Sequence, residues 1–224
     1  MNTDDRIERT RTLYAQAVYA GDATALTEAE RDLDAVDADA ALARGRILHG
    51  RFLTARDTPG SPAAAEDPAE LPLFERALAA YRRLGDVRGE GEALFWIGCL
   101  HQVIRRDNDT AVPLLERSGA LAAQAGDVAT QAEALRHLGV AAHMAGRLDE
   151  ARAHLEESTR LRRETGALPG VASNMIGLAY IAAAQDRRAD ALSILDEAHA
   201  LGQAHGAHAI VQHIEQARTA IEAG

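Results

Sequence analysis

The sequence predicts an all-α protein in which consecutive helices pack antiparallel. Of the 224 residues, 47% are hydrophobic but only 4% are aromatic. Alanine and leucine are abundant and runs of β-branched residues are missing, a composition that favours closely packed helices over strands. A glycine that recurs about every 40 residues divides much of the chain into similar segments. A chain of this length can bury a substantial apolar core, and we expect a single domain over residues 1–224.

Four glycines that recur at nearly equal intervals predict where helices end, the first interval being one residue longer than the other two. Glycine takes the left-handed conformation that closes a helix at little cost, and the aspartate after the first two glycines can cap the next helix. Between these turns lies a second segment, with apolar residues at helical spacing and a small residue where two helices approach closely. Each repeat is therefore expected to be two helices joined by a tight turn. The glycines are Gly85, Gly126, Gly166 and Gly206.

The clearest repeat is "HLGVAAHMAGRLDEARAHLEES", residues 137–158. It contains a Leu-Gly pair, an alanine three residues on, and then an alanine followed four residues later by a leucine, with Gly146 at the turn. This pattern resembles the tetratricopeptide repeat family, and the match extends over residues 87–205. The units have about 40 residues where the standard unit has about 34. In this they resemble the repeats of large bacterial transcriptional and signalling regulators. The matching residues are Leu138, Gly139, Ala142, Ala151 and Leu155.

The rest of the chain fits the repeat more loosely. "YAQAVYAGDATALTEAERDL" predicts two helices about the Gly21-Asp22 turn, and "ADAALARGRILHGRFLTARD" predicts a further helix. Three prolines in residues 58–70 stop that helix, and we expect a loop inserted within a repeat there. Residues 208–222 are expected to form a helix that caps the stack. The resemblance thus implies a curved α-α superhelix, or solenoid, of about eleven antiparallel helices.

Charge and composition exclude several classes of partner. The net charge of −10 argues against binding duplex nucleic acid or an anionic membrane. All 24 basic residues are arginine, which excludes a lysine Schiff base and a lysine-dependent phosphate loop, and which the codon bias of a GC-rich bacterium would explain. Cys99 is the only cysteine, the first residues do not resemble a signal peptide, and no apolar run is long enough to span a membrane. We therefore expect a cytoplasmic protein without a cofactor.

The family resemblance implies a ligand groove on the concave surface, lined by the first helix of each repeat. The residues expected to face it include the only tryptophan, two of the three phenylalanines and three histidines. Aromatic and arginine side chains are common binding anchors, and Arg136 is the candidate to pair with an acidic group of a ligand. The lysines and asparagines with which some relatives clamp a peptide carboxylate are absent. The expected groove residues are His49, Phe52, Glu92, Phe95, Trp96, Cys99, Gln102, Arg136, His137, Val140, His143 and Tyr180, with Ser173 beside them.

The sequence leads to three hypotheses about function. The leading hypothesis is a non-enzymatic scaffold or regulatory adaptor that holds a peptide or protein partner. The alternative is a small-molecule-binding protein or an enzyme of specialised metabolism, with an aromatic and histidine-lined concave pocket. A third is self-association as a homo-oligomer through exposed sides of the last helix, at Ile210, Val211 and Ile214.

Catalytic and metal-binding interpretations rest on weaker patterns. Cys99 and His137 could act as nucleophile and base if both face the groove, but Cys99 is equally suited to packing as a small apolar residue. Among the nine histidines, His205 and His208 alone have the spacing of a metal-binding pair, and they flank a predicted turn. The neighbouring aromatics at positions 95 and 96 could likewise plug a tight superhelix instead of binding a ligand. We therefore assign no catalytic residue and no metal site.

Overall fold

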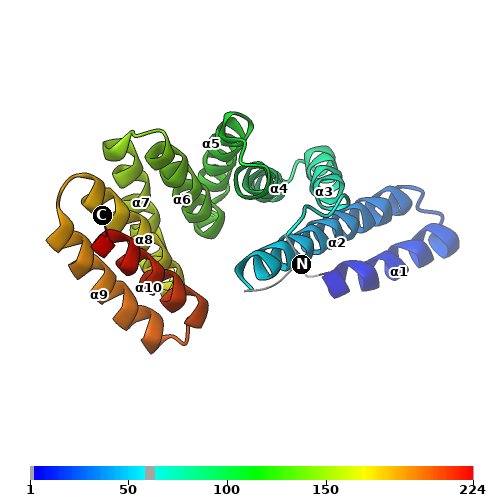
Figure 1. Ribbon diagram of the computed structural model, residues 1–224. Coiled ribbons are helices and arrows are strands. Elements are labelled where there is room, and N and C mark those ends of the chain that lie inside the picture. The colour runs from blue at the N-terminus through cyan, green and yellow to red at the C-terminus, as the bar shows by residue number, and fades with distance from the viewer. Residues whose placement is uncertain (1–2, 59–63, 224) are drawn as a thin grey trace. The chain divides into compact units, whose positions relative to one another are not determined.

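The computed structural model describes residues 3–58 and 64–223, and the regular structure in these ranges is helical (Figure 1). Consecutive helices pack against one another within each unit, which confirms the all-α prediction and the helical-repeat architecture. The chain forms two compact units, residues 1–107 (unit 1) and 108–224 (unit 2). That the two make up one domain stays a prediction. The helices are α1 (Thr3–Ala20), α2 (Thr24–Asp57), α3 (Glu70–Leu84), α4 (Val87–Cys99), the π-helix η1 (Leu100–Ile104), α5 (Asn108–Ala125), α6 (Val128–Met144), α7 (Leu148–Glu164), α8 (Leu168–Ala184), α9 (Arg188–Ala204) and α10 (His208–Ala223).

Glycine turns separate the repeats as the sequence predicts. Gly85 ends α3 in the left-handed conformation, with φ of 69°. Asp86 then caps α4, because its carboxylate accepts a hydrogen bond from the amide of Gly89 at 2.9 Å. The equivalent glycine of the next repeat has φ of 68°, and Asp127 after it accepts a hydrogen bond from the amide of Thr130 at 3.2 Å. The turn and the cap are thus built from adjacent residues in both repeats.

A π-helical turn explains why the first interval between the recurring glycines is one residue longer than the others. The turn inside each repeat lies at Arg106, Gly146 and Asp186, which have φ of 56°, 74° and 58°. The extra residue lies before this inner turn, because the stretch 85–106 is one residue longer than the stretches 126–146 and 166–186. A π-helix bonds each residue to the fifth one on and therefore takes up one residue more than an α-helical turn. The extra residue is accommodated in η1.

In unit 2, one leucine lies between glycines of the two helices that flank it. Leu155 of α7 is 2% exposed. A Cβ atom added at Gly139 of α6 would lie 2.8 Å from its Cγ, and one added at Gly177 of α8 would lie 2.8 Å from its Cδ1. Both distances are far below a van der Waals contact. The leucine therefore fills the space that the two absent side chains leave, and α6 and α8 both pack closely on α7.

The buried positions of the second helices repeat from one unit to the other. Residues equivalent to Leu155 are fully buried in α3, α5 and α9. Four residues earlier, each helix has another fully buried position, which holds alanine in α5, α7 and α9 but Glu70 in α3. The leucine series is Phe74, Leu115, Leu155 and Leu195, and the series four residues earlier is Glu70, Ala111, Ala151 and Ala191.

One expected helix boundary is absent, because the helices predicted to end at Leu33 and to begin at Ala38 are a single helix, α2. No glycine or proline lies between residues 24 and 44, so nothing in the sequence ends the helix there. The acidic residues of this stretch are held by ion pairs, from Arg9 to Asp32 at 2.9 Å and from Arg6 to Asp39 at 2.7 Å. The described residues form ten α-helices and one π-helix, which agrees with the predicted solenoid of about eleven helices.

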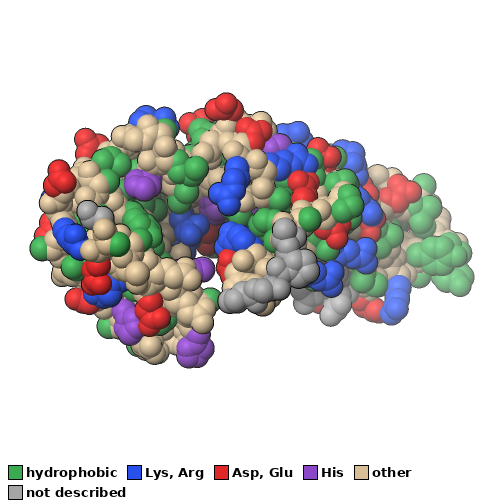
Figure 2. All heavy atoms as spheres, in the orientation of Figure 1, with side chains coloured by type: hydrophobic (Ala, Val, Ile, Leu, Met, Phe, Trp, Pro, Cys, Tyr) green, Lys and Arg blue, Asp and Glu red, His purple; other side chains and the backbone are tan. Residues whose placement is uncertain are grey.

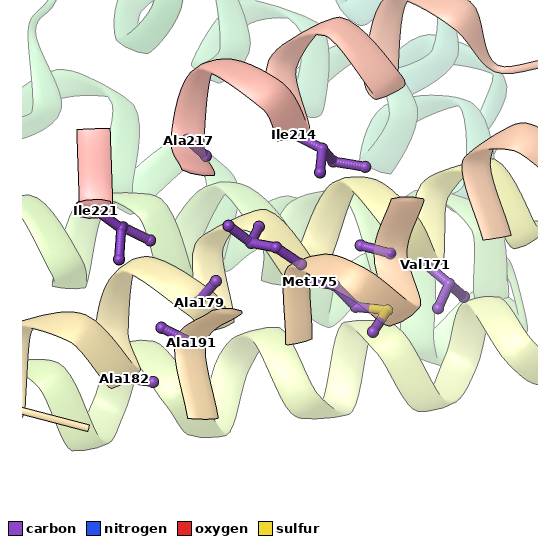
Figure 3. Close-up of a cluster of buried hydrophobic side chains, with 10 residues drawn as sticks. Val171, Met175, Ala179, Ala182, Ala191, Ile214, Ala217 and Ile221 are labelled. Atoms are coloured by element: carbon purple, nitrogen blue, oxygen red, sulfur yellow. The ribbon is translucent and has the colours of Figure 1, made fainter. Parts of the chain in front are cut away.

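The expected loop at residues 58–70 separates α2 from α3, and residues 59–63 of it lie outside the described residues. The last helix, α10, packs on α8 and α9. Figure 3 shows its Ile214 and Ile221 in an apolar cluster with Met175 of α8. Because Val211 and Ile214 are themselves buried, the prediction that they form an exposed self-association contact is wrong.

In unit 1, Tyr81 of α3 is buried against a neighbouring helix. Its ring occupies the place where a side chain at Gly89 of α4 would be. Its hydroxyl group donates a hydrogen bond to Asp39 Oδ1 of α2 at 2.9 Å. Burial, together with the hydrogen bond to Asp39 and the negative charge there, raises the pKa of Tyr81 far above its ordinary value of about 10.

Gly139→Ala should lower the free energy of unfolding by about 1–3 kcal/mol, because the new methyl group would overlap Leu155 and crowd the carbonyl oxygen of Ala151 at 3.2 Å. Gly119→Ala in α5 is the matched control, since its Cβ would meet Ala134 Cβ at an ordinary 3.6 Å. Alanine's greater helix propensity should make that variant more stable by up to about 1 kcal/mol. Urea unfolding followed by circular dichroism measures both changes, and equal effects would contradict the packing account.

The pKa of Tyr81 predicts a loss of stability in alkali. Below pH about 10 the tyrosine is neutral in both the folded and the unfolded chain, and stability is unaffected. Above it the unfolded chain ionises first, so the free energy of unfolding should fall by about 1.4 kcal/mol by pH about 11. Tyr81→Phe should remove this loss, although it also removes one hydrogen bond at neutral pH. Urea titrations followed by Trp96 fluorescence test this, and an unchanged pH slope in the variant would refute it.

Candidate functional site

Unit 1 contains a row of three buried side chains from three helices. His49 of α2 lies between Glu70, at the start of α3, and Cys99, at the end of α4. Its Nδ1 atom is 2.8 Å from Glu70 Oε1, and its Nε2 atom is 3.6 Å from Cys99 Sγ. We call these three side chains the buried row. His49 and Cys99 are predicted groove residues and are thus enclosed by the helices, as is Gln102 of η1.

The expected aromatic groove residues of unit 1 pack on one another. The Trp96 ring stacks on Phe74 with 5.9 Å between centroids, and meets Phe95 edge-on at 5.1 Å and the imidazole of the buried row edge-on at 5.5 Å. The guanidinium group of Arg46 lies 5.3 Å from the tryptophan centroid and pairs with Glu92 at 3.2 Å. These contacts are those of a core plug, with only an edge of the cluster reaching solvent.

A hollow of about 490 Å³ lies one helical turn beyond the buried row. Phe52 of α2, three residues after His49, and Val103 of η1, four residues after Cys99, are among its lining residues. So are Glu66 and the guanidinium of Arg105, which donates two hydrogen bonds to that carboxylate at 2.9 and 2.7 Å. These bonds lower the pKa of Glu66. Phe52 is therefore the one predicted groove residue of unit 1 that lines a hollow in the described part of the chain.

Unit 2 brings together the predicted residues Arg136 and His137 of α6 and Ser173 of α8. The Arg136 guanidinium donates to His137 Nε2 and to Ser173 Oγ, both at 3.4 Å. These distances are long for hydrogen bonds from a charged donor. Arg136 is half-buried, whereas His137 is buried. The side chains therefore form a small polar patch on adjoining first helices, and its cation is held only loosely.

A second arginine, Arg162 of α7, lies in the same region and was not among the expected groove residues. Its side chain is 7% exposed and occupies the space left by Gly170 of α8. Its Nη2 atom forms an ion pair with Glu133 Oε2 at 2.7 Å, and its Nε has no hydrogen-bond partner among the described residues. Burial lowers the pKa of Arg162, Glu133 opposes this, and the positive charge of Arg136 lowers it further.

A buried polar network lies beside these arginines. Asn174 of α8 donates from Nδ2 to Ser158 Oγ at 2.9 Å and to Thr159 Oγ1 at 3.2 Å. Ser158 in turn donates to the carbonyl oxygen of Ala132 in α6 at 2.6 Å. Three helices are thereby linked through side-chain hydrogen bonds. This network fixes the positions from which the two arginines project.

The other expected residues of unit 2 do not join this patch by any contact that the structure shows. Val140 and His143 lie further along α6, and both are half-buried. Tyr180 of α8 packs against the apolar cluster formed by α8, α9 and α10. The predicted groove residues of unit 2 therefore include a polar patch and, separately, a side chain that supports the core.

Two further surface features contain none of the expected groove residues. A hollow of about 440 Å³ lies between α5 and the end of α6 and is lined in part by Pro113 and Met144. Large exposed apolar side chains gather over the α1–α2 turn, as Figure 2 shows, with Tyr19 86% exposed.

The described ranges are residues 3–58 and 64–223. Within these ranges, no three or more His, Cys, Asp or Glu side chains are grouped so that they could hold a metal ion. No helix in the same ranges has the length and apolar character needed to cross a bilayer. His205 and His208 lie on either side of the turn between α9 and α10, as the sequence predicts.

A family model described as tetratricopeptide repeat matches residues 130–204. No curated protein matches the chain. The matched residues cover nearly all of α6 and the whole of α7, α8 and α9, in which both the Leu155 packing and the arginine pair lie. Such repeats are typical of protein-interaction scaffolds. Residues 130–204 of the chain are therefore similar to tetratricopeptide repeats.

Proposed function

We propose that this protein is a non-enzymatic scaffold, acting in the cytoplasm, that binds an acidic segment of a partner protein on α6 and α8. The family match supports a protein partner. The observation that carries the choice of an acidic segment is the arginine pair of unit 2, Arg136 and Arg162. Two guanidinium groups stand close enough for one to depress the pKa of the other, with Glu133 as the ion-pair partner of Arg162.

The two arginines have hydrogen-bond donors for which the protein itself supplies no well-placed acceptor. Arg136 reaches His137 and Ser173 only at 3.4 Å, and Nε of Arg162 has no hydrogen-bond partner among the described residues. A guanidinium group presents several donors in a planar fork that matches a carboxylate. A ligand carboxylate could accept hydrogen bonds from the half-buried Arg136, and its negative charge would offset the repulsion between the two cations.

Small molecules, nucleic acid and anionic membranes fit the structure less well as ligands. A small-molecule pocket would need the aromatic side chains free for a ligand, but Trp96 packs on both Phe74 and Phe95. The net charge of −10 disfavours nucleic acid and anionic membranes as partners. An acidic protein with a local pair of arginines is instead suited to select one acidic segment while repelling acidic surfaces in general.

Arg136→Ala should weaken capture of the partner about tenfold or more, because a charged hydrogen bond contributes about 1.5–3 kcal/mol. The matched control is Arg160→Ala, which removes an exposed arginine of α7 whose partners are Glu157 and Glu164. Immobilised wild-type protein and both variants are incubated with native lysate, and the captured proteins are quantified by mass spectrometry. Polyglutamate should compete for the capture and polylysine should not. Equal capture by Arg136→Ala and wild type would overturn the proposal.

Arg162→Met should separate binding from stability. Methionine has a similar length, and replacing a buried ion pair by an apolar side chain is often neutral or stabilising by about 1–4 kcal/mol. Glu133 keeps its hydration because its side chain is 44% exposed. We expect an unchanged or higher free energy of unfolding in urea together with loss of capture. A variant that unfolds more easily yet captures the partner normally would show that Arg162 serves the fold alone.

A further inference from the structure

The buried row of unit 1 has the order of a nucleophile, a base and the carboxylate that orients the base. Cys99 and His49 are 4% and 2% exposed, and Glu70 is fully buried. The sulfur and the Glu70 carboxylate lie on opposite ring nitrogens of His49, at 3.6 and 2.8 Å. Because the imidazole separates them, the three groups cannot converge on one metal ion. They can pass a proton along a line.

Glu70 is the member of the row that packing does not explain. The equivalent positions of the other second helices hold alanine, and those alanines are as fully buried as Glu70. Burying a carboxylate costs several kcal/mol unless its lone pairs are satisfied, yet Glu70 Oε2 has no hydrogen-bond partner among the described residues. Its place at the start of α3 lets the helix dipole favour a negative charge there. An alanine would suffice for the fold, as it does in the other repeats.

The carboxylate sets the role of each nitrogen of His49. When Nδ1–H donates to Glu70 Oε1, the other nitrogen, Nε2, has its lone pair directed at the Cys99 thiol. The thiol proton can then move to Nε2, and the negative charge of Glu70 stabilises the imidazolium that forms. Glu70 is thus a positioning residue, whereas His49 is the base that contacts the reacting sulfur.

The burial of Cys99 limits the size of the molecules that can reach its sulfur. Cys99 is almost wholly enclosed, and the hollow nearest to it begins one helical turn away, at Phe52 and Val103. The π-helix η1 starts directly after Cys99 and carries the chain to that hollow. A small, uncharged molecule could pass from the hollow to the sulfur through side-chain motion of Phe52, which is half-buried. A peptide or a charged metabolite could not.

We propose that Cys99 is a nucleophilic thiol for a small peroxide, with His49 as its base and Glu70 as the residue that holds the base. The thiol gives its proton to His49 Nε2, and the sulfur attacks one oxygen of hydrogen peroxide. The S–O bond forms as the O–O bond breaks, and the departing hydroxide takes the proton from His49 to leave as water. Sulfur is oxidised by two electrons to the sulfenic acid and the peroxide is reduced. The chain has no second cysteine, so the sulfenic acid cannot be converted to an internal disulfide.

Wild-type protein is treated in the folded state with hydrogen peroxide, the peroxide is removed with catalase, and the chain is then unfolded in urea that contains dimedone, which traps any sulfenic acid formed. Dimedone adds to sulfenic acid and not to methionine sulfoxide, so the adduct reports Cys99 alone, and Cys99→Ser gives the background. The wild-type rate of adduct formation should be nearly flat from pH about 6.5 to 8.5, whereas an ordinary thiol gains about tenfold per pH unit in this range. The urea-unfolded protein supplies that ordinary thiol. A folded protein that forms no adduct, or that follows the pH profile of the unfolded chain, overturns the proposal.

Three variants then assign the roles. His49→Gln should slow adduct formation about 100-fold, and Glu70→Gln about tenfold with the pH dependence of an ordinary thiol restored. His101→Gln is the matched control, because His101 lies two residues from Cys99 but pairs with Asp107, at 3.6 Å. It should react like wild type. Thermal unfolding of each variant verifies that it is folded. Wild-type rates in folded His49→Gln and Glu70→Gln would show that the row has no part in the reaction.

Discussion

The packing of unit 2 depends on the contact between Leu155 of α7 and the glycines of the two first helices beside it. Neither Gly139 nor Gly177 could carry a side chain without overlap with Leu155, so one leucine sets the separation of three helices. The same arrangement recurs in unit 1, where the Phe74 ring occupies the space that a side chain at Gly45 would need. A large side chain on a second helix and a missing one on a first helix therefore form the packing unit of this repeat. Apolar burial supplies the driving force, and the glycines decide the distance at which the helices meet.

The close approach of the helices also buries polar side chains that a looser stack would leave in solvent. Arg162 belongs to a second helix, yet the space at Gly170 lets it reach the region of Arg136 on a first helix. In unit 1, Glu70 occupies a position that is alanine in the other repeats, and it meets His49 because α2 and α3 pack closely. Both chemically informative clusters therefore arise where a repeat position with a packing role carries a charged residue instead.

The sequence allows the turns and most helices to be predicted, because glycine spacing and apolar periodicity are local signals. It also holds a signal for η1, since the interval from Gly85 to Gly126 contains one residue more than the two intervals after it. The continuity of α2 is not predicted from the repeat pattern, which divides residues 24–57 between two helices although no helix-ending residue lies between them. Arg162 lies outside the predicted set because that set is drawn from the first helices alone. The pairing of Cys99 with His49 depends on which helices adjoin, and no local pattern carries that information.

A double-mutant cycle between Gly139 and Leu155 tests the central claim most directly. The free energy of unfolding is measured for wild type, Gly139→Ala, Leu155→Ala and the double variant. If the leucine fills the space that the glycine leaves, the methyl group should cost almost nothing once Leu155 is shortened, and the coupling should amount to about 1–3 kcal/mol. Costs that add to within about 0.5 kcal/mol would show that the two residues act independently, and would contradict the account.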